Sequence, residues 1–253
     1  MKKIILALIA LPFLVSSAMA APVKFPGRGI ENGVSKRISD SKLFISAGVE
    51  SDNVLDRELE DSSTAEFNAI SGEIALEYDK KIKGYVTLGQ VMNVEFEEKF
   101  DSDVAKIIVE DKFIWGVGLA GKTSVLEVAD LFGDLSYRMA EGMGWTSVDI
   151  NGTIYQIADI MDANITWREW HAAVGISKDF KYITPYAGIR YSDAAAKLEA
   201  TVDGTLYKGS INAVNKMGVF VGARIVPAAD TNIHIQGRFI DETALMVSAS
   251  LPF

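Results

Sequence analysis

Apolar residues alternate with polar or small ones through almost the whole chain after its first forty positions. This period of two residues is typical of β-strands, and no segment of useful length shows the 3.6-residue period of a helix. The pattern predicts an all-β protein. About ten strands are predicted, with approximate spans 42–57, 64–79, 84–97, 106–120, 124–150, 153–178, 182–202, 205–226, 232–241 and 244–253.

Short polar connections separate these segments. Asn151-Gly152 and Asp203-Gly204 each lie between two alternating runs and predict tight hairpins with type I′ turns, which need positive φ at both central residues. Within the long segment 124–150, Gly142 and Gly144 are expected to mark β-bulges. The remaining short connections are expected at 79–83, 121–124, 179–181 and 227–231.

Alternation alone fits either a soluble β-sandwich or a membrane-spanning β-barrel, and three further features favour the barrel. The apolar stripes cover roughly 9–11 residues, the length of a tilted spanning strand. The connections are alternately short and long. Aromatic residues fall at two heights, as in the two interfacial girdles of membrane barrels. The girdle at the end of the short turns is predicted as Tyr78, Trp115 and Phe253, and the girdle at the other end as Phe96, Tyr137, Trp170, Tyr191 and Phe239.

We therefore predict a closed antiparallel up-and-down transmembrane β-barrel of about ten strands, with eight or twelve as alternatives. Both chain ends should lie on the side of the short turns, which requires an even number of strands. Asp203-Gly204 should accordingly lie at the opposite end of the barrel from Asp179-Phe180. A soluble secreted β-sandwich that binds a ligand is the less favoured alternative.

The first twenty residues have the features of a secretory signal peptide. Lys2 and Lys3 precede an apolar stretch that is too short to span a membrane, and Ala18-Met19-Ala20 has the small-x-small pattern of a cleavage site. Residues 1–20 are therefore expected to be removed. Residues 21–41, which are polar and carry four basic side chains, are expected to form either a periplasmic tail or a plug in the lumen. The barrel itself is assigned to 42–253.

The last ten residues carry a resemblance to a known superfamily. Apolar residues occupy every second position and the chain ends on an aromatic residue: Leu245, Val247, Ala249, Leu251 and Phe253. This final strand resembles the assembly signal of bacterial outer-membrane β-barrel proteins, with Pro252 as a departure from the commonest form. The resemblance implies a porin-like or surface barrel in the outer membrane of a Gram-negative-type bacterium. The partners it implies are the barrel-assembly machinery, outer-membrane lipid and lipopolysaccharide.

Composition excludes several kinds of chemistry. The chain has 25 basic and 34 acidic residues, a formal net charge of −9, which argues against binding nucleic acid. The absence of Cys excludes a disulfide scaffold, a thiolate metal site and a Cys nucleophile. Two His residues supply a His-based metal site poorly, so no metal and no cofactor are predicted.

The predicted inward face carries both signs of charge. In a narrow ten-stranded lumen such side chains either pair into a structural network or leave a narrow polar path for ions. The inward charged residues are predicted as Glu73, Glu77, Glu95, Glu110, Lys112, Asp134, Arg138, Glu169, Arg190, Arg224 and Arg238. Acidic runs at 51–64 and 97–103 are expected to be solvated loops.

Enzymatic barrels are the competing class. The outer-membrane aspartate-histidine proteases resemble this chain in having about ten long strands, but their chemistry needs a His at the extracellular mouth. Here His171 and His234 are both predicted to face the lumen below the mouth. Lipid A deacylase-type barrels place a His and a Ser toward lipid instead. We therefore predict no catalytic residues and a structural, surface-interaction or narrow-pore role, with a surface protease or lipid-modifying enzyme as the alternative.

Overall fold

The alternating segments form thirteen β-strands in a computed structural model, which describes residues 43–59, 63–79, 81–100, 103–126, 129–156, 162–202, 205–228 and 231–252. The predicted signal peptide, the segment 21–41 and Phe253 lie outside the described residues. The strands are β1 (Leu43–Asp56), β2 (Thr64–Tyr78), β3 (Ile82–Phe100), β4 (Asp103–Val109), β5 (Lys112–Leu126), β6 (Ala129–Ile150), β7 (Thr153–Gln156), β8 (Asp162–Ser177), β9 (Ile183–Val202), β10 (Thr205–Asn212), β11 (Met217–Ala228), β12 (Thr231–Phe239) and β13 (Thr243–Pro252).

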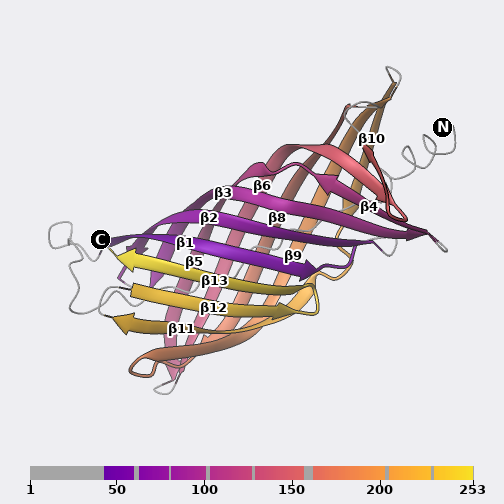
Figure 1. Cartoon of the computed structure of the whole chain (residues 1–253). Coiled ribbons are helices and arrows are strands. Elements are labelled where there is room, and N and C mark those ends of the chain that lie inside the picture. The colour runs from indigo at the N-terminus through magenta and orange to yellow at the C-terminus, as the bar shows by residue number, and fades with distance from the viewer. Residues whose placement is uncertain are drawn as a thin grey trace.

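Ten of the described strands close an antiparallel barrel (Figure 1). Around the barrel they follow the order β1, β2, β3, β5, β6, β8, β9, β11, β12, β13, and β13 pairs back onto β1 with Ser46 opposite Pro252 and Val54 opposite Ala244. The three short strands β4, β7 and β10 are not part of this closed ring. In the sequence they come directly before β5, β8 and β11 respectively. The predicted all-β barrel of ten strands is confirmed, and so is its outer-membrane-type architecture of an even number of antiparallel strands.

We call the end that carries the turns 78–82, 126–129, 177–183 and 228–231 the proximal end, and the opposite end the distal end. The turn near Asp179 and the end of β9 at Val202 lie at opposite ends of the barrel. Asp203 and Gly204 themselves lie outside the described residues, so the type I′ turn expected there stays a prediction. The backbone at Asn151 and Gly152 has φ of 52° and 84°, which confirms the type I′ turn. The turn predicted at 121–124 is wrong, because β5 continues to Leu126 with Ser124 opposite Asp130.

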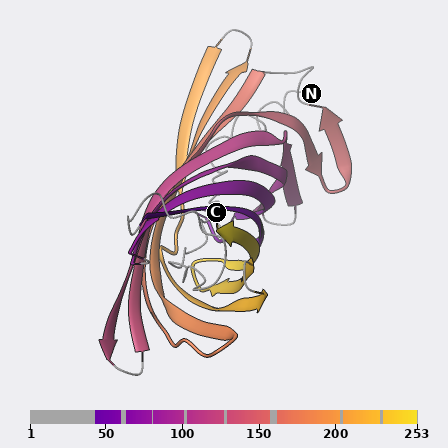
Figure 2. The same cartoon turned by 90° about the vertical axis from the view of Figure 1, so that its left-hand side faces the viewer.

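The barrel wall is much higher on one side than on the other (Figure 2). The hairpins β3–β4, β6–β7 and β9–β10, together with β8, form a tall wall, in which β6 has 22 residues and β9 has 20. On the other side β12 has 9 residues and β13 has 10, and with β1 and β11 they form a short wall. The tall wall alone therefore extends far beyond the distal rim of the short wall.

A seam of backbone irregularities crosses the part of the tall wall from β3 to β6 and reverses which residues face inward on those strands. Asn93 in β3 and Gly142 in β6 have positive φ. The strand structure is interrupted at Glu110, between the end of β4 and the start of β5. The backbone N–H of Glu110 donates to the carbonyl of Gly144, which joins the seam across strands. The bulge predicted at Gly142 is confirmed. Beyond such a bulge the alternation continues with the opposite set of residues inside.

The outer surface of the barrel carries an apolar band that begins at the proximal end. On β8, for example, Val174 and Ile176 are exposed, and on β9 Ile189 is exposed. Two aromatic pairs mark the distal limit of this band on the tall wall: Trp115 with Tyr137, ring centroids 5.8 Å apart, and Trp170 with Tyr191, 5.1 Å apart. Among the described residues, there is no helix long and apolar enough to cross a membrane.

Four of the predicted girdle positions need comment. Tyr78 is exposed at the proximal end and Phe239 is exposed near the distal rim of the short wall, in agreement with the prediction. Trp115 was predicted at the proximal end but packs against Tyr137, so it belongs to the distal row. Phe96 is wrong as an outward residue, because the seam at Asn93 turns it into the lumen, where it is 1% exposed.

Candidate functional site

The interior of the barrel is the candidate site, and its side chains form layers from the proximal to the distal end. In the first layer Lys122 bridges Asp130 (2.7 Å) and Asp179 (3.2 Å), and Arg224 contacts Asp179 at 3.0 Å. Burial would raise the pKa of Asp179, but the hydrogen bond from Thr184 and the two cations lower it below its usual value. This layer ties the turn after β8 to β5, β6 and β11.

Three aromatic rings form the next layer on one side of the lumen. Phe132, Tyr186 and Phe220 are 0–4% exposed, with ring centroids 5.9–6.3 Å apart. Glycines opposite these residues on the neighbouring paired strands make room for the rings. A Cβ at Gly188 would lie 2.5 Å from the Phe220 ring, and one at Gly175 would lie 2.6 Å from Phe132. The space beside these inward glycines is therefore occupied by aromatic rings, which leave no open path on this side of the lumen.

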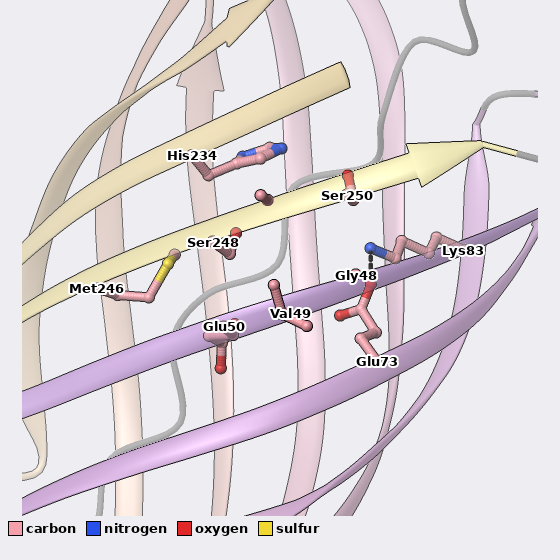
Figure 3. Close-up of a pocket in the computed structure, with 10 residues that line it drawn as sticks. Gly48, Val49, Glu50, Glu73, Lys83, His234, Met246, Ser248 and Ser250 are labelled. Atoms are coloured by element: carbon pink, nitrogen blue, oxygen red, sulfur yellow. Dashed lines mark ion pairs between the residues drawn. The ribbon is translucent and has the colours of Figure 1, made fainter. Parts of the chain in front are cut away.

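On the other side of the lumen, at similar height, lies a small polar cavity (Figure 3). Its volume is about 30 Å³, enough for a water molecule, and an ion pair between Lys83 and Glu73 at 2.6 Å forms one of its walls. His234 from β12 and Ser248 and Ser250 from β13 line the opposite wall (Figure 3). His234 faces the lumen, as predicted, and lies far from the distal mouth.

Above these layers four side chains from β3, β6 and β8 form a hydrogen-bonded series. His171 Nε2 lies 2.7 Å from Asp134, His171 Nδ1 lies 3.0 Å from the Ser136 hydroxyl, and the Tyr85 hydroxyl donates to the other Asp134 oxygen at 2.9 Å. If the Nε2–H donates to the carboxylate, the neutral imidazole accepts from Ser136. All four side chains are buried, and His171 is 0% exposed. Sequence reasoning placed His171 in the lumen but missed its partners.

The centre of the lumen is a buried network of four arginines and five carboxylates. Arg57, from the link between β1 and β2, reaches Glu169 at 3.3 Å and Glu242 at 3.4 Å. The remaining members bind across the lumen: Arg190 to Asp241 (2.9 Å), Glu242 (2.9 Å) and Glu169 (3.5 Å), Arg238 to Asp52 (2.6 Å) and Glu242 (2.5 Å), and Arg138 to Glu50 (3.2 Å) and Asp52 (3.7 Å). We call these nine residues the arginine network. They join the short wall to the tall wall through the centre.

Two of the carboxylates lie in the turn between β12 and β13, which folds into the lumen. Burial raises the pKa of Asp241 to about 6 despite the nearby Arg190. Burial would also raise the pKa of Glu242, but the charges of Arg238, Arg190 and Arg57 lower it to about 2. Ile240 in the same turn has φ of 85°, a strained value for a β-branched residue. The inward fold of the turn therefore carries a backbone cost that its ion pairs offset.

The distal layer is apolar. Its members include Phe67, Phe96, Met143, Trp145 and Trp167, each at most 5% exposed, and most of the layer lies beyond the outward aromatic pairs. The indole N–H groups of Trp145 and Trp167 have no hydrogen-bond partner among the described residues. We call this layer the distal core. It seals the lumen beyond the arginine network.

Eight of the eleven predicted lumen charges are buried inside the barrel: Glu73, Glu77, Asp134, Arg138, Glu169, Arg190, Arg224 and Arg238. The other three were wrong as members of a buried network. The seam turns Glu95 toward the outer face, and the side chains of Glu110 and Lys112, 42% and 39% exposed, pair with each other at 2.8 Å. Within the described ranges, no group of three or more His, Asp or Glu side chains could hold a metal ion.

Sequence reasoning missed five members of the arginine network. Arg57 and Asp241 are the last residues of the predicted spans 42–57 and 232–241, but the structure places them and Glu242 in links between strands, where alternation does not determine which way a side chain points. Glu50 and Asp52 have the alternation of inward residues on β1, so a closer count along that strand would have found them. In the last strand Leu245, Val247 and Leu251 are exposed on one outward face, while Ala249 is half-buried. Their role in assembly stays a prediction.

The chain is similar in fold, at low sequence identity, to several solved structures. No protein-family model matches the chain, and no curated protein matches it. Among solved structures, it is similar to the outer membrane protease OmpT from Escherichia coli (TM-score 0.48, 10% identity, 83% of this chain and 96% of that one). It is also similar to the translocator domain of the autotransporter NalP from Neisseria meningitidis (0.47, 10%, 100% and 95%) and to the outer membrane protein OprG from Pseudomonas aeruginosa (0.39, 10%, 84% and 96%).

Proposed function

We propose that the chain is an integral outer-membrane barrel of a Gram-negative-type bacterium that neither conducts solutes nor catalyses a reaction. Its role is that of a surface barrel, with the proximal turns in the periplasm and the tall wall outside the cell. The apolar outer band supports the membrane location, and so do the row of outward aromatic pairs on the tall wall and the exposed Tyr78, Phe180 and Tyr182 at the proximal end. The tall wall then offers β-sheet surface to extracellular partners.

The arginine network is the observation that carries the non-conducting role. Arg57, Arg190 and Arg238 are at most 1% exposed and are bound on several sides across the lumen. A hydrated ion would have to separate these pairs and then cross the distal core, which offers almost no polar group. Both barriers act in series, so removal of either alone leaves the path closed.

Planar-bilayer recording of the purified full-length chain tests this proposal. We expect no discrete conductance steps above the baseline of detergent-only controls. Heat-modifiable gel mobility of the same sample verifies that the inserted barrel is folded. Reproducible single-channel steps from such a sample would contradict the proposal and favour a narrow pore.

A hydrolase is the second candidate, because Ser136, His171 and Asp134 form a hydrogen-bonded series of nucleophile, base and carboxylate. Against it, the three side chains are 0–6% exposed and the arginine network lies between them and the distal mouth. A fluorophosphonate probe separates the two candidates. The non-catalytic role predicts no labelling, and labelling that the Ser136→Ala variant abolishes would support the hydrolase.

A further inference from the structure

Two unpaired cations on the outside of the tall wall lie immediately distal to the Trp170–Tyr191 pair. Arg168 on β8 and Lys197 on β9 are exposed, and neither has an ion-pair partner among the described residues. Arg168 lies opposite Ala195 and Lys197 opposite Thr166, so the two side chains are diagonal neighbours on the same face. Diagonal neighbours lie about 7 Å apart, close enough for both to reach one anionic group.

The height of these cations on the wall indicates where that group would come from. Trp170 lies opposite Asp193, two residues proximal to Arg168 and four proximal to Lys197. At about 3.3 Å per residue along a tilted strand, the cations lie roughly 5–10 Å beyond the aromatic pair. Aromatic side chains mark the level where hydrocarbon meets headgroups. The cations therefore lie at the level of the headgroups, and Val174 and Ile176 below them face the acyl chains.

Neighbouring charges on this part of the wall are already paired. Lys216 binds Asp193 at 2.7 Å and Lys208 binds Glu199 at 2.5 Å, so each of these acids is neutralised within the wall. Glu141 on β6 is exposed, has no ion-pair partner among the described residues, and lies two positions along β6 from Met139, the residue opposite Arg168, so it offsets one of the two positive charges. Around Arg168 and Lys197 the wall is thus locally positive, in a chain whose formal net charge is −9. This local excess favours an anionic ligand over a cation.

We propose that Arg168 and Lys197 bind a phosphate of the outer-leaflet glycolipid, with the exposed face of Trp170 against its sugar or first acyl carbons. Arg168 supplies a planar fork of donors that suits phosphate oxygens, and Lys197 adds a second point charge. Trp170, which is 41% exposed, supplies the apolar contact below them. The proposal rests on the membrane location proposed above and names the lipid that this face of the tall wall selects.

Native mass spectrometry of the full-length protein in detergent, titrated with bis-phosphorylated lipid A, tests the site. The variant R168Q/K197Q should bind this lipid about tenfold more weakly than the wild type, because it loses two charge-assisted contacts. The matched control K178Q/K181Q removes two exposed lysines from a proximal turn and should change binding less than about twofold. Dephosphorylated lipid A should bind wild type and R168Q/K197Q equally.

Heat-modifiable mobility shows whether each variant still forms a barrel, and Arg168→Glu provides a second test if the double variant does not fold. Unchanged affinity of a folded R168Q/K197Q for bis-phosphorylated lipid A would overturn the proposal. An equal loss of affinity for phosphatidylglycerol would overturn the choice of glycolipid. Membrane fractionation of cells tests the location separately, since a chain absent from the outer membrane contradicts the proposed function whatever the purified barrel binds.

Discussion

Replacing Arg57 with Met removes the one member of the arginine network that comes from the link between β1 and β2. Its guanidinium lies 3.3 Å from Glu169 and 3.4 Å from Glu242, and it donates to the Ser192 hydroxyl at 2.8 Å. All of these side chains are buried. Met has nearly the same length, so the substitution removes the charge and the hydrogen bonds while it leaves most of the volume filled.

The expected loss follows from the carboxylates that remain. Breaking a buried ion pair by removal of one partner costs about 3–5 kcal/mol, because the other charge stays buried without compensation. Arg190 still contacts Glu169 at 3.5 Å and Glu242 at 2.9 Å, which moderates the effect. We therefore expect Arg57→Met to lower the free energy of unfolding by about 3 kcal/mol, the lower end of that range.

Urea unfolding of the barrel in lipid vesicles, followed by tryptophan fluorescence, measures this loss. The matched control is Lys208→Met, which breaks an ion pair whose side chains are 62% and 54% exposed and should cost no more than about 1 kcal/mol. Adding Glu169→Gln to Arg57→Met removes one uncompensated charge and should recover about 1–2 kcal/mol.

Two results would refute this reasoning. If Arg57→Met unfolds within about 1 kcal/mol of the wild type, the network does not hold the two walls together. If Glu169→Gln lowers the free energy of unfolding of Arg57→Met by as much as it lowers that of the wild type, the two residues are not coupled through their charges. This conclusion holds whatever the loss measured for Arg57→Met alone.

Three further outcomes follow from the same interior. Gly218→Ala should destabilise the barrel by about 1–3 kcal/mol, because its Cβ would lie 1.8 Å from an Asp241 oxygen, whereas Gly72→Ala, with no neighbour nearer than 3.8 Å, should be nearly neutral in the same urea assay. Trp167→Ala should cost about 3–5 kcal/mol in that assay, since the side chain is wholly buried in the distal core, and a loss below 1 kcal/mol would show that the core is loosely packed. Asp241 has a pKa of about 6 in the folded protein against an ordinary value of 3.8, so as the pH falls the folded protein binds this proton before the unfolded chain does. The free energy of unfolding should therefore rise by about 1 kcal/mol between pH 7 and pH 5. Unfolding at both pH values checks this, and Asp241→Asn should make the rise smaller by that amount.

Strand number, order and closure could be predicted from the sequence because each depends on a regular period and on short turns. The prediction of inward charges held wherever that period was unbroken, as on β8, where Glu169 and His171 face the lumen. It failed where the seam shifts the period by one residue. A bulge could be expected at Gly142, but Asn93 has no strong signal in the local pattern for such a shift, and the shift at Asn93 moves Phe96 inward and Glu95 outward.

The centre of the candidate site could not be predicted for a different reason. Arg57, Asp241 and Glu242 lie outside the strands, and their inward position depends on contacts with residues far along the chain, such as that between Arg57 and Glu169, which are 112 residues apart. Periodicity describes only neighbours along the chain. Opposite charges in these two links could have suggested inward folding, but they fit a solvated rim equally well.

The distal core has a consequence for how the protein responds to temperature. Its side chains come mostly from the tall wall and from β2 and, in the proposed orientation, lie mostly outside the membrane, so their unfolding exposes apolar surface to water. Exposure of apolar surface to water raises the heat capacity, whereas the outer band stays against lipid hydrocarbon and contributes little. The two halves of one continuous sheet therefore have different thermodynamics. Cooling weakens the distal half, as in a soluble β-protein, while the proximal half keeps the flat temperature dependence of a membrane barrel.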